Sequence, residues 1–392
     1  MLLIKNKMLK VNSHIHTPYS FSAFKSIKEA FQLAEKEGIQ VLGINDFFVT
    51  DGYTEFNDIA QQYRIYPLFN IEFIGLLKEE QDKGIRVNDP GNPGRMYFCG
   101  KALKNPVSFS DNSRDKLDKV IAESQVQVKE MLEKLSGLLL SIDAPFSLAY
   151  DKIKMQYARE LVRERHIAQG LRNAINEHFT EPESKLVFLT KLYSGDAPLA
   201  DLNNNNSFEG ELRSKLLKAG GAAFVTEDES SFLPIPELVE IIIDGGGIPC
   251  YPVLLDDKNG SYTDFEKNPE ALLNRLKELN VGAVELIPGR NNIINLKPFV
   301  KFFHDHNFLV SFGTEHNTPE MAPMEVKAGG NTFLDDYLLG INEETACIFT
   351  AHQERVKKGL EGYIDSDGQC KTSEKNIFIK EGQSILDNFL SK

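Results

Sequence analysis

The 392-residue sequence predicts an α/β protein with parallel strands and a mainly helical segment between two strand-rich parts. Three observations support this fold class. A strand, a helix and a second strand follow one another between residues 9 and 44, and such a βαβ unit implies parallel pairing with a right-handed crossover. The same alternation returns after Pro234. The chain is also long enough for one large barrel with an insert.

The N-terminal elements are marked by local signals. An apolar-rich strand is predicted to start near residue 9 and to end in a His-Ile-His sequence at 14–16. A capping box and a final glycine bound a helix at residues 26–38, where apolar residues recur at helical spacing. Further strands are predicted at residues 39–44 and 66–73.

Chemistry-bearing side chains stand at the ends of these strands. His14 and His16 share one face of the first strand, because alternate side chains of a strand point to opposite sides. Asp46 and Glu72 stand at the ends of the next two strands. In parallel α/β folds the carboxyl ends of strands build the active site. The pattern therefore favours a metal site over the alternative of two solvated histidines at a strand end.

The middle of the chain is expected to be helical. Residues 78–112 are rich in Gly, Pro, Asn and Asp and predict a long irregular loop. Residues 117–135 follow the three-four spacing of an amphipathic packing helix, and a second helical stretch is predicted at residues 152–178. The asparagine-rich stretch at 196–208 predicts a loop.

Strands and helices alternate again from residue 236 to residue 312. The triple glycine at 245–247 follows a helix, which favours a helix end over a phosphate-binding loop. The tail from about residue 331 is expected to be helical. Strands are predicted at residues 248–255, 281–287 and 308–312, and helices at residues 236–244, 269–279 and 296–306.

The composition limits the possible partners. Lysine and arginine number 44 against 57 aspartates and glutamates, which gives a net charge of −13, so we expect no broad binding of nucleic acid. A small anionic substrate is still compatible, because a bound metal can invert the local field. The four scattered cysteines, and the lack of a long apolar run or a leader at residues 1–5, favour a cytoplasmic protein without a membrane span. No pattern predicts the oligomeric state.

With these residues assembled, the chain resembles the polymerase and histidinol phosphatase (PHP) superfamily of metal-dependent phosphoesterases. The family's opening motif, H-x-H-T-x-x-S, corresponds to residues 14–20, and its T-D-H-D-x-x-x-G motif is similar to residues 45–52. Its metal-binding glutamate corresponds to Glu72. The likeness covers about residues 10–318 and implies a distorted TIM-like (β/α)7 barrel with a largely helical insertion.

Two further segments resemble the branch that contains nucleoside 3′,5′-bisphosphate phosphatases and 5′-to-3′ exonucleases. The R-P-H-I-A motif of that branch is similar to residues 163–168, and its A-G-G-x-x-x-x-A-H-P segment is loosely similar to residues 246–252. The resemblance divides the chain into a first barrel part at 1–76, a helical insertion at 77–235 that contributes His166, a second barrel part at 236–320 and a helical extension at 321–392.

The resembling enzymes hold up to three metals, and the first site is the one retained most fully here. Residue-by-residue carry-over implies the ligands His14, His16, Glu72 and Glu315, with Glu315 in place of the family's aspartate. Two nitrogen and two carboxylate ligands suit zinc, manganese or iron.

The other two sites depart from the family pattern. The second keeps His166 beside Glu72, but its other histidine is replaced by Tyr251, or by Val253 in another register. Phenylalanine cannot ligate a metal, so the third site is expected to be lost. The resemblance therefore implies one or two divalent ions. The positions of the third site hold Phe21, Phe47 and either His316 or Asn317.

The resemblance implies a metal-dependent hydrolase that cleaves a phosphoester of a small metabolite or nucleotide with metal-activated water. Loss of two-metal clamping leaves open a single-metal lyase, isomerase or non-phosphate hydrolase on the same scaffold, and also an inactive relative used for binding. The expected roles are phosphate binding by Arg163, Arg165 or Arg290, proton relay by Asp46 or His316, and protonation of the leaving group by Tyr251.

Overall fold

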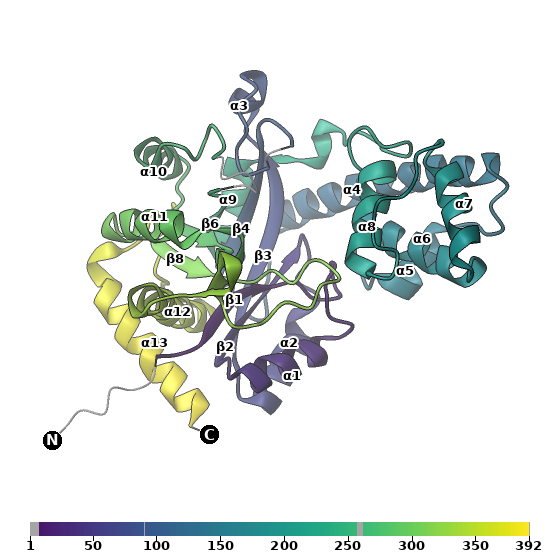
Figure 1. Ribbon diagram of the computed structural model, residues 1–392. Helices are drawn as coiled ribbons and strands as arrows, with labels where there is room; N and C mark the ends of the chain where they lie inside the picture. The colour runs from purple at the N-terminus through teal and green to yellow at the C-terminus, as the bar shows by residue number, and fades with distance from the viewer. Residues whose placement is uncertain (1–7, 90, 257–261, 392) are drawn as a thin grey trace.

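The centre of the computed structural model, which describes residues 8–89, 91–256 and 262–391, is a nearly closed barrel of seven strands (Figure 1). In barrel order these are β1 (Val11–Ile15), β2 (Val41–Phe47), β3 (Tyr66–Leu76), β4 (Arg95–Lys101), β6 (Ile248–Val253), β7 (Ala283–Leu286) and β8 (Leu309–Phe312). Neighbouring strands are parallel, except that β4 runs antiparallel to β3 and β6. A parallel bridge between Ile15 and Glu315 joins the two ends of the sheet. The predicted α/β barrel is thereby confirmed.

Helices cover the outer face of the barrel and close one end of it. In chain order they are α1 (Ile27–Glu37), α2 (Tyr53–Tyr63), α3 (Lys78–Asp82), α4 (Asp111–Ser141), α5 (Tyr150–Tyr157), α6 (Glu164–His178), α7 (Pro182–Leu192), α8 (Asn205–Leu212), α9 (Ile235–Asp244), α10 (Pro269–Glu278), α11 (Ile293–Asp305), α12 (Asp336–Lys357) and α13 (Lys375–Leu390). Short pairings add β5 (Leu233–Pro234) beside β3, and β9 (Lys327–Ala328) with β10 (Thr332–Phe333).

The end of the barrel opposite the strand carboxyl ends is closed by α12 and α13. Their apolar side chains form one buried core with residues from the first halves of the strands, such as Val11 and Val41. The two helices cross closely at Gly382, where a Cβ atom would lie only 1.9 Å from the carbonyl oxygen of Cys347. The helical tail predicted from residue 331 is therefore a structural part of the barrel.

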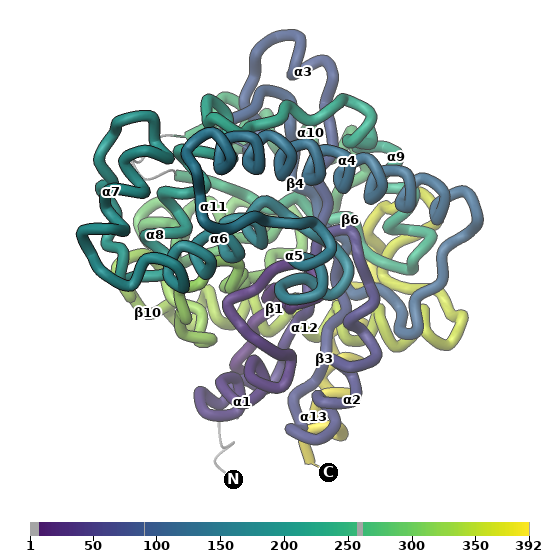
Figure 2. The backbone as a smooth tube through the Cα atoms, turned by 90° about the vertical axis from the view of Figure 1, so that its right-hand side faces the viewer, coloured from purple at the N-terminus to yellow at the C-terminus, as the bar shows by residue number. Residues whose placement is uncertain are grey.

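A helical arm, formed by α4 to α8, projects from one side of the barrel (Figure 1) and faces the viewer in Figure 2. The long helix α4 joins the two parts. Its residues Leu117 and Val120 belong to the barrel core, whereas Val128 to Leu139 belong to a separate core within the arm. The arm places the start of α6 beside the barrel opening, where Arg163 and Arg165 line the same cavity as Glu72.

The local signals of the first helix predicted it correctly. The Ser26 hydroxyl accepts a hydrogen bond from the Glu29 amide at the start of α1, and Gly38 ends the helix with φ of 72°. The predicted single helix at 152–178 is two helices, α5 and α6, separated by extended residues around 158–163.

The prediction of an irregular loop at residues 78–112 is wrong for its central part. Residues 95–101 form β4, so a barrel strand lies inside the range that the resemblance assigned to an insertion. The interior face of β4 carries Cys99 and Lys101, and both are fully buried. A charged residue at an interior position hides the alternation by which a strand is normally predicted.

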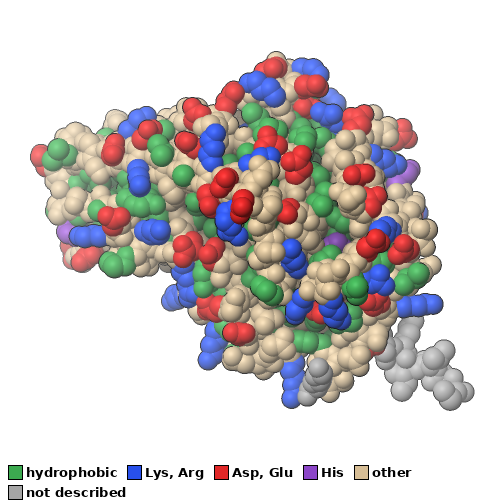
Figure 3. Space-filling model, turned by 180° about the vertical axis from the view of Figure 1, so that it is seen from behind, with side chains coloured by type: hydrophobic (Ala, Val, Ile, Leu, Met, Phe, Trp, Pro, Cys, Tyr) green, Lys and Arg blue, Asp and Glu red, His purple; other side chains and the backbone are tan. Residues whose placement is uncertain are grey.

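The described surface agrees with the charge expected from composition. Figure 3 shows acidic and basic side chains interspersed over the rear face. Among residues 8–89, 91–256 and 262–391, no helix combines the length and the apolar character needed to cross a membrane. Residues 1–5, where no leader was predicted, lie outside the described residues.

Candidate metal centre

Three predicted metal ligands meet where β1 ends and where β3 makes its last pairing with β2, at Glu72. The Nε2 atoms of His14 and His16 lie 3.3 Å apart, and His16 Nε2 lies 3.3 Å from Glu72 Oε2. A tetrahedral ion bonded at about 2.0–2.1 Å needs neighbouring ligand atoms about 3.3–3.4 Å apart. Both separations match that requirement, so His14, His16 and Glu72 fit a metal ion.

The protonation states of this cluster also suit a cation. Burial lowers the pKa of His16 to about 4, so its imidazole is neutral near pH 7 and offers a lone pair. Burial raises the pKa of Glu72, and the neighbouring carboxylates of Glu315 and Glu285 add to that effect. Because the three carboxylates repel one another, a bound cation would stabilise their ionised forms.

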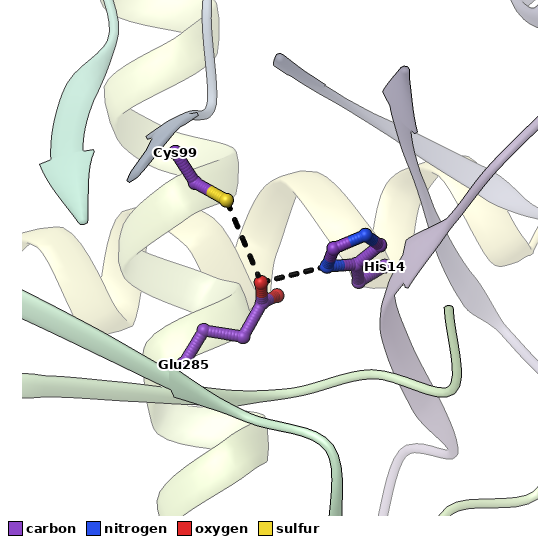
Figure 4. Close-up of side chains that lie close together, drawn as sticks. All are labelled: His14, Cys99 and Glu285. Carbon is purple, nitrogen blue, oxygen red and sulfur yellow. Dashed lines mark hydrogen bonds and ion pairs between the residues drawn. The ribbon is translucent and has the colours of Figure 1, made fainter. Parts of the chain in front are cut away.

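A second buried group lies on the other side of His14 (Figure 4). His14 Nδ1 is 2.7 Å from Glu285 Oε2 on β7, and Cys99 Sγ on β4 is 3.9 Å from the same oxygen. The other oxygen of Glu285 accepts a hydrogen bond from Lys101 Nζ at 2.5 Å. Burial raises the pKa of the Cys99 thiol, which keeps it protonated. We therefore interpret this group as a hydrogen-bonded support for His14, comparable to the outer shell of metal sites.

Asp46 supports the loop that follows β1 and does not line the cavity beside Glu72. Its carboxylate accepts hydrogen bonds from the Thr17 amide at 2.7 Å, the Thr17 hydroxyl at 2.5 Å and the Ser20 hydroxyl at 2.6 Å. The threonine and serine of the opening motif are thereby explained. They bind Asp46 and fix the path of the chain after His16.

Glu315 lies beside the centre, but its carboxylate is engaged by an arginine. Its amide donates to the His14 carbonyl at 2.9 Å, and its carbonyl accepts from the His16 amide at 2.7 Å. The carboxylate accepts from Arg290 Nη1 at 2.8 Å, and also from Arg290 Nη2 and the Asn317 amide. Glu315 is thus fixed next to both histidines, with Arg290 in the position of its counter-ion.

The structure does not bring His166 and His316 into the cluster. His166 lies in the first turn of α6, where its Nδ1 accepts from the Arg163 amide at 3.0 Å, and it lines a neighbouring cavity. His316 has both ring nitrogens engaged, by the Thr314 hydroxyl and the Ala322 carbonyl, each at 2.8 Å. In this arrangement His316 supports the loop after β8 and has no free nitrogen for proton relay.

Tyr251 points away from the centre. Pro252 pairs with Glu285, whose side chain points into the barrel, so Tyr251 faces the opposite side of β6. The Tyr251 hydroxyl donates to Glu266 at 2.8 Å. Val253, the residue of the other register, lines the cavity beside Glu72, but its side chain has no atom that could bind a metal.

The two phenylalanines that replace family ligands form an aromatic wall against His16. Phe21 and Phe47 stack on the imidazole with ring centroids 4.8 and 5.5 Å away. Arg165 lies 5.0 Å from the centroid of Phe21, and Arg163 lies 5.4 Å from that of Phe47. These contacts hold two guanidinium groups close to the candidate ligands.

A cavity of about 250 Å³, called here the arginine cavity, adjoins the centre. Four guanidinium groups line it together with Glu72, Glu285 and Glu315, and they belong to Arg163, Arg165, Arg213 and Arg290. Burial and the proximity of Arg213 lower the pKa of Arg165 to about 10. Arg213 was not predicted from the sequence. It lies just after α8, and only its position in the folded arm indicates a role.

A second cavity, of about 350 Å³, adjoins the arginine cavity on the side of the arm. The two cavities share Phe21, Arg165, Arg213 and Asn317. Arg172 Nε lies 3.3 Å from Glu209 Oε1, whereas the buried Nε atom of Arg213 has no hydrogen-bond acceptor among the described residues. Together the cavities offer space for a ligand larger than a single phosphate group.

Comparisons with known proteins give a likeness in fold. No family model and no curated protein matches the chain. A proposed metal-dependent phosphoesterase from Bifidobacterium adolescentis matches with a TM-score of 0.56 and 15% identity, over 85% of this chain and 95% of that one. An amidohydrolase from Chromobacterium violaceum, with bound sulfate and no metal, matches with a TM-score of 0.51 and 14% identity, over 80% of this chain and 93% of that one. The fold is thus that of metal-dependent phosphoesterases and amidohydrolases.

Proposed function

We propose that this protein is a metal-dependent phosphoesterase of the PHP type that acts on a small phosphorylated metabolite or nucleotide with one divalent ion. The observation that carries the proposal is the junction of two features. Two imidazoles and a carboxyl group stand at the spacing of metal ligands, and they open onto a cavity lined by four guanidinium groups.

Each half of this site matches one part of a phosphoester. Guanidinium groups bind phosphate oxygens in a bidentate manner, and they keep their charge when buried. A cavity with four of them therefore favours a phosphate group over a neutral amide or ester. The sulfate held by the Chromobacterium protein is also a tetrahedral dianion, which supports an oxyanion site on this fold.

The residues divide the work between metal binding and substrate binding. His14, His16 and Glu72 would hold the ion, which supplies Lewis acidity toward a phosphoryl oxygen and lowers the pKa of a water molecule. Arg165 and Arg213 line both cavities, so they can bind the phosphate while the second cavity receives the rest of the substrate. Phe21 and Phe47 shield His16 from bulk water.

The proposed substrate is small. The net charge of −13 disfavours a long polyanion. The four arginines of the cavity face four glutamates, and Arg213 and Arg290 pair with Glu164 and Glu315, so the cavity offers local guanidinium donors rather than an extended positive field. A nucleotide or a sugar phosphate fits this distribution better than duplex nucleic acid does.

The test begins with the metal content of protein purified without chelator, followed by reloading with zinc, manganese or iron. The loaded protein is then assayed for phosphate release from a panel of phosphomonoesters and phosphodiesters, with the His16→Ala variant as the negative control. Metal-dependent release that is lost in the variant supports the proposal. A metal-loaded protein that releases no phosphate from any panel member contradicts it and favours a single-metal lyase or amide hydrolase. Failure to bind metal favours a binding protein.

A further inference from the structure

Lys101 is a charged residue inside the barrel that the sequence did not indicate. It lies at the end of β4, its side chain is fully buried, and it does not line the arginine cavity. Its Nζ atom is 2.5 Å from Glu285 Oε1 and 3.0 Å from Asn45 Oδ1. A buried ammonium group is costly unless its hydrogen bonds are satisfied, so both contacts have structural consequences.

The ammonium group fixes which way its two neighbours face. It carries only donors, so Asn45 must turn its oxygen toward Lys101 and its NH₂ group away. Glu285 likewise gives one oxygen to Lys101 and keeps the other free. Both of the groups that remain are directed at His14.

Glu285 sets the tautomer of His14. Its Oε2 atom lies 2.7 Å from Nδ1 and can only accept, so Nδ1 carries the proton and the neutral ring has its lone pair on Nε2. The Asn45 amide nitrogen lies against the ring, 3.1 Å from Nε2 and 3.4 Å from Nδ1, and leaves the in-plane lone pair of Nε2 free. The unprotonated Nε2 is also the atom that faces His16 Nε2 at 3.3 Å.

We propose that Lys101 is the positioning residue of the metal centre, and that it acts through Glu285 to hold the Nε2 lone pair of His14 toward the ion. The proposal rests on the metal centre of the proposed function, but it makes no use of the reaction. Metal affinity can therefore test it even if no phosphoester proves to be a substrate.

The first test needs no variant. In metal-free wild-type protein labelled with ¹⁵N-histidine, NMR reports which ring nitrogen of His14 is protonated, with the His14→Gln variant used for assignment. A protonated Nδ1 and an unprotonated Nε2 are expected. A proton on Nε2 overturns the proposal.

The second test is a double-mutant cycle on zinc affinity, measured by competition with a chelator. Lys101→Met is expected to weaken zinc binding about 10- to 100-fold, as is typical for the loss of outer-shell support. Glu285→Gln is expected to weaken zinc binding at least as much. The Gln side-chain oxygen would still accept the hydrogen bond from Lys101, so the Gln NH₂ group would face His14 Nδ1. Lys119→Met, at an exposed lysine of α4, is the matched control.

The decisive variant is the double mutant Lys101→Met/Glu285→Gln. With no ammonium present, the glutamine can turn its oxygen to His14, so zinc affinity should recover about tenfold relative to Glu285→Gln alone. If Lys101 had a purely structural role, the losses of zinc affinity in Lys101→Met and in Glu285→Gln would multiply in the double mutant. Losses that multiply, or an unchanged affinity in folded Lys101→Met, would overturn the proposal. Circular dichroism of each variant establishes that it is folded, and the NMR result decides the matter if one is not.

Discussion

Two pairs of buried histidines in this protein are equally shielded from solvent but differ in the direction of their lone pairs. His14 and His16 at the end of β1 are 1% and 0% exposed, and His316 and His352 are 3% and 1% exposed. His352 on α12 accepts a hydrogen bond from a backbone amide at 2.9 Å and has its other nitrogen 2.8 Å from a backbone carbonyl. His316 likewise has both nitrogens engaged.

At the end of β1 the nitrogens face each other instead. The two Nε2 atoms are 3.3 Å apart, and a carboxylate oxygen lies 3.3 Å from one of them. Burial alone therefore does not identify a functional histidine. The difference between the pairs lies in the ring nitrogens. Both nitrogens of His316 and of His352 are hydrogen-bonded to the surrounding fold, whereas the Nε2 atoms of His14 and His16 face a common point.

The largest effect that tests this contrast is expected in His16→Ala. Removing one of three ligands should weaken zinc binding at least about 100-fold, while the fold is retained because the polar contacts of the His16 ring are to Ser20 and to the other two candidate ligands. Chelator competition measures the loss. His352→Gln is the matched control and should bind zinc like the wild type. Equal losses in both variants would contradict the contrast.

The second effect concerns stability and pH at His352. Burial lowers the pKa of His352 to about 4, below its usual value near 6.5. The unfolded chain therefore takes up the proton first, and this contribution to stability is full above about pH 6.5 and falls away as the pH drops toward 4. The loss is roughly 3 kcal/mol at most. Urea unfolding at pH 7.5 and pH 5 should show a smaller pH dependence in His352→Gln than in the wild type.

An equal pH dependence in His352→Gln and in the wild type would contradict the lowered pKa of His352.

The sequence predicted the half of the site that depends on local pattern. The shared face of His14 and His16 follows from strand alternation. Glu72 was predicted at a strand end, but β3 continues to Leu76, and Glu72 is the last residue of β3 that pairs with β2. The α/β barrel was predicted by the same alternation of strands and helices. The caps of α1 were predicted for the same reason, because they depend on residues a few positions apart.

The other half depends on long-range packing. Lys101 lies on a strand that was predicted as loop, and its partner Glu285 is 184 positions away in the sequence. The face of β6 that carries Tyr251 is decided by pairing with β7, which no local pattern reports. His316 was predicted to be catalytic because it stands in a motif, but the irregular loop that follows it supplies a carbonyl to its Nε2.

A smaller effect is expected when the arginine cavity loses one cation. Arg165→Met should weaken the binding of inorganic phosphate about tenfold, because charged hydrogen bonds contribute roughly 1.5–3 kcal/mol. Zinc affinity should not change, since Arg165 contacts the ring of Phe21 and not the candidate ligands themselves. Calorimetric titration of the metal-loaded protein with phosphate measures the loss.

Arg159→Met is the matched control for that experiment. Arg159 also stacks on an aromatic ring, that of Tyr19, but it lies outside the arginine cavity and pairs with Glu55. An equal loss of phosphate affinity in both variants would show that the loss comes from the overall electrostatic field of the helical arm and not from Arg165 in particular. An unchanged affinity in Arg165→Met would remove Arg165 from the anion site.

The smallest effect is expected at the pair of Arg290 and Glu315. The Arg290 side chain is 48% exposed, so the pair contributes only about 0.2–1 kcal/mol. Arg290→Met releases the Glu315 carboxylate beside the histidines and should tighten zinc binding about two- to fivefold. The gain should vanish in Arg290→Met/Glu315→Gln. A loss of zinc affinity in the single variant would show that Glu315 does not reach the ion.

The bridge between Ile15 and Glu315 also sets the order in which the molecule can be assembled during synthesis. The three candidate ligands lie within the first 72 residues, yet the contacts that fix His14 and His16 come from residues 285 and 315. The bridge closes a loop of 300 residues. Such closures occur late in folding, because the chain must lose conformational entropy before the stabilising contacts form. A ribosome must therefore release most of the chain before the first strand has its final neighbours, so the candidate metal centre is complete only in a nearly finished polypeptide.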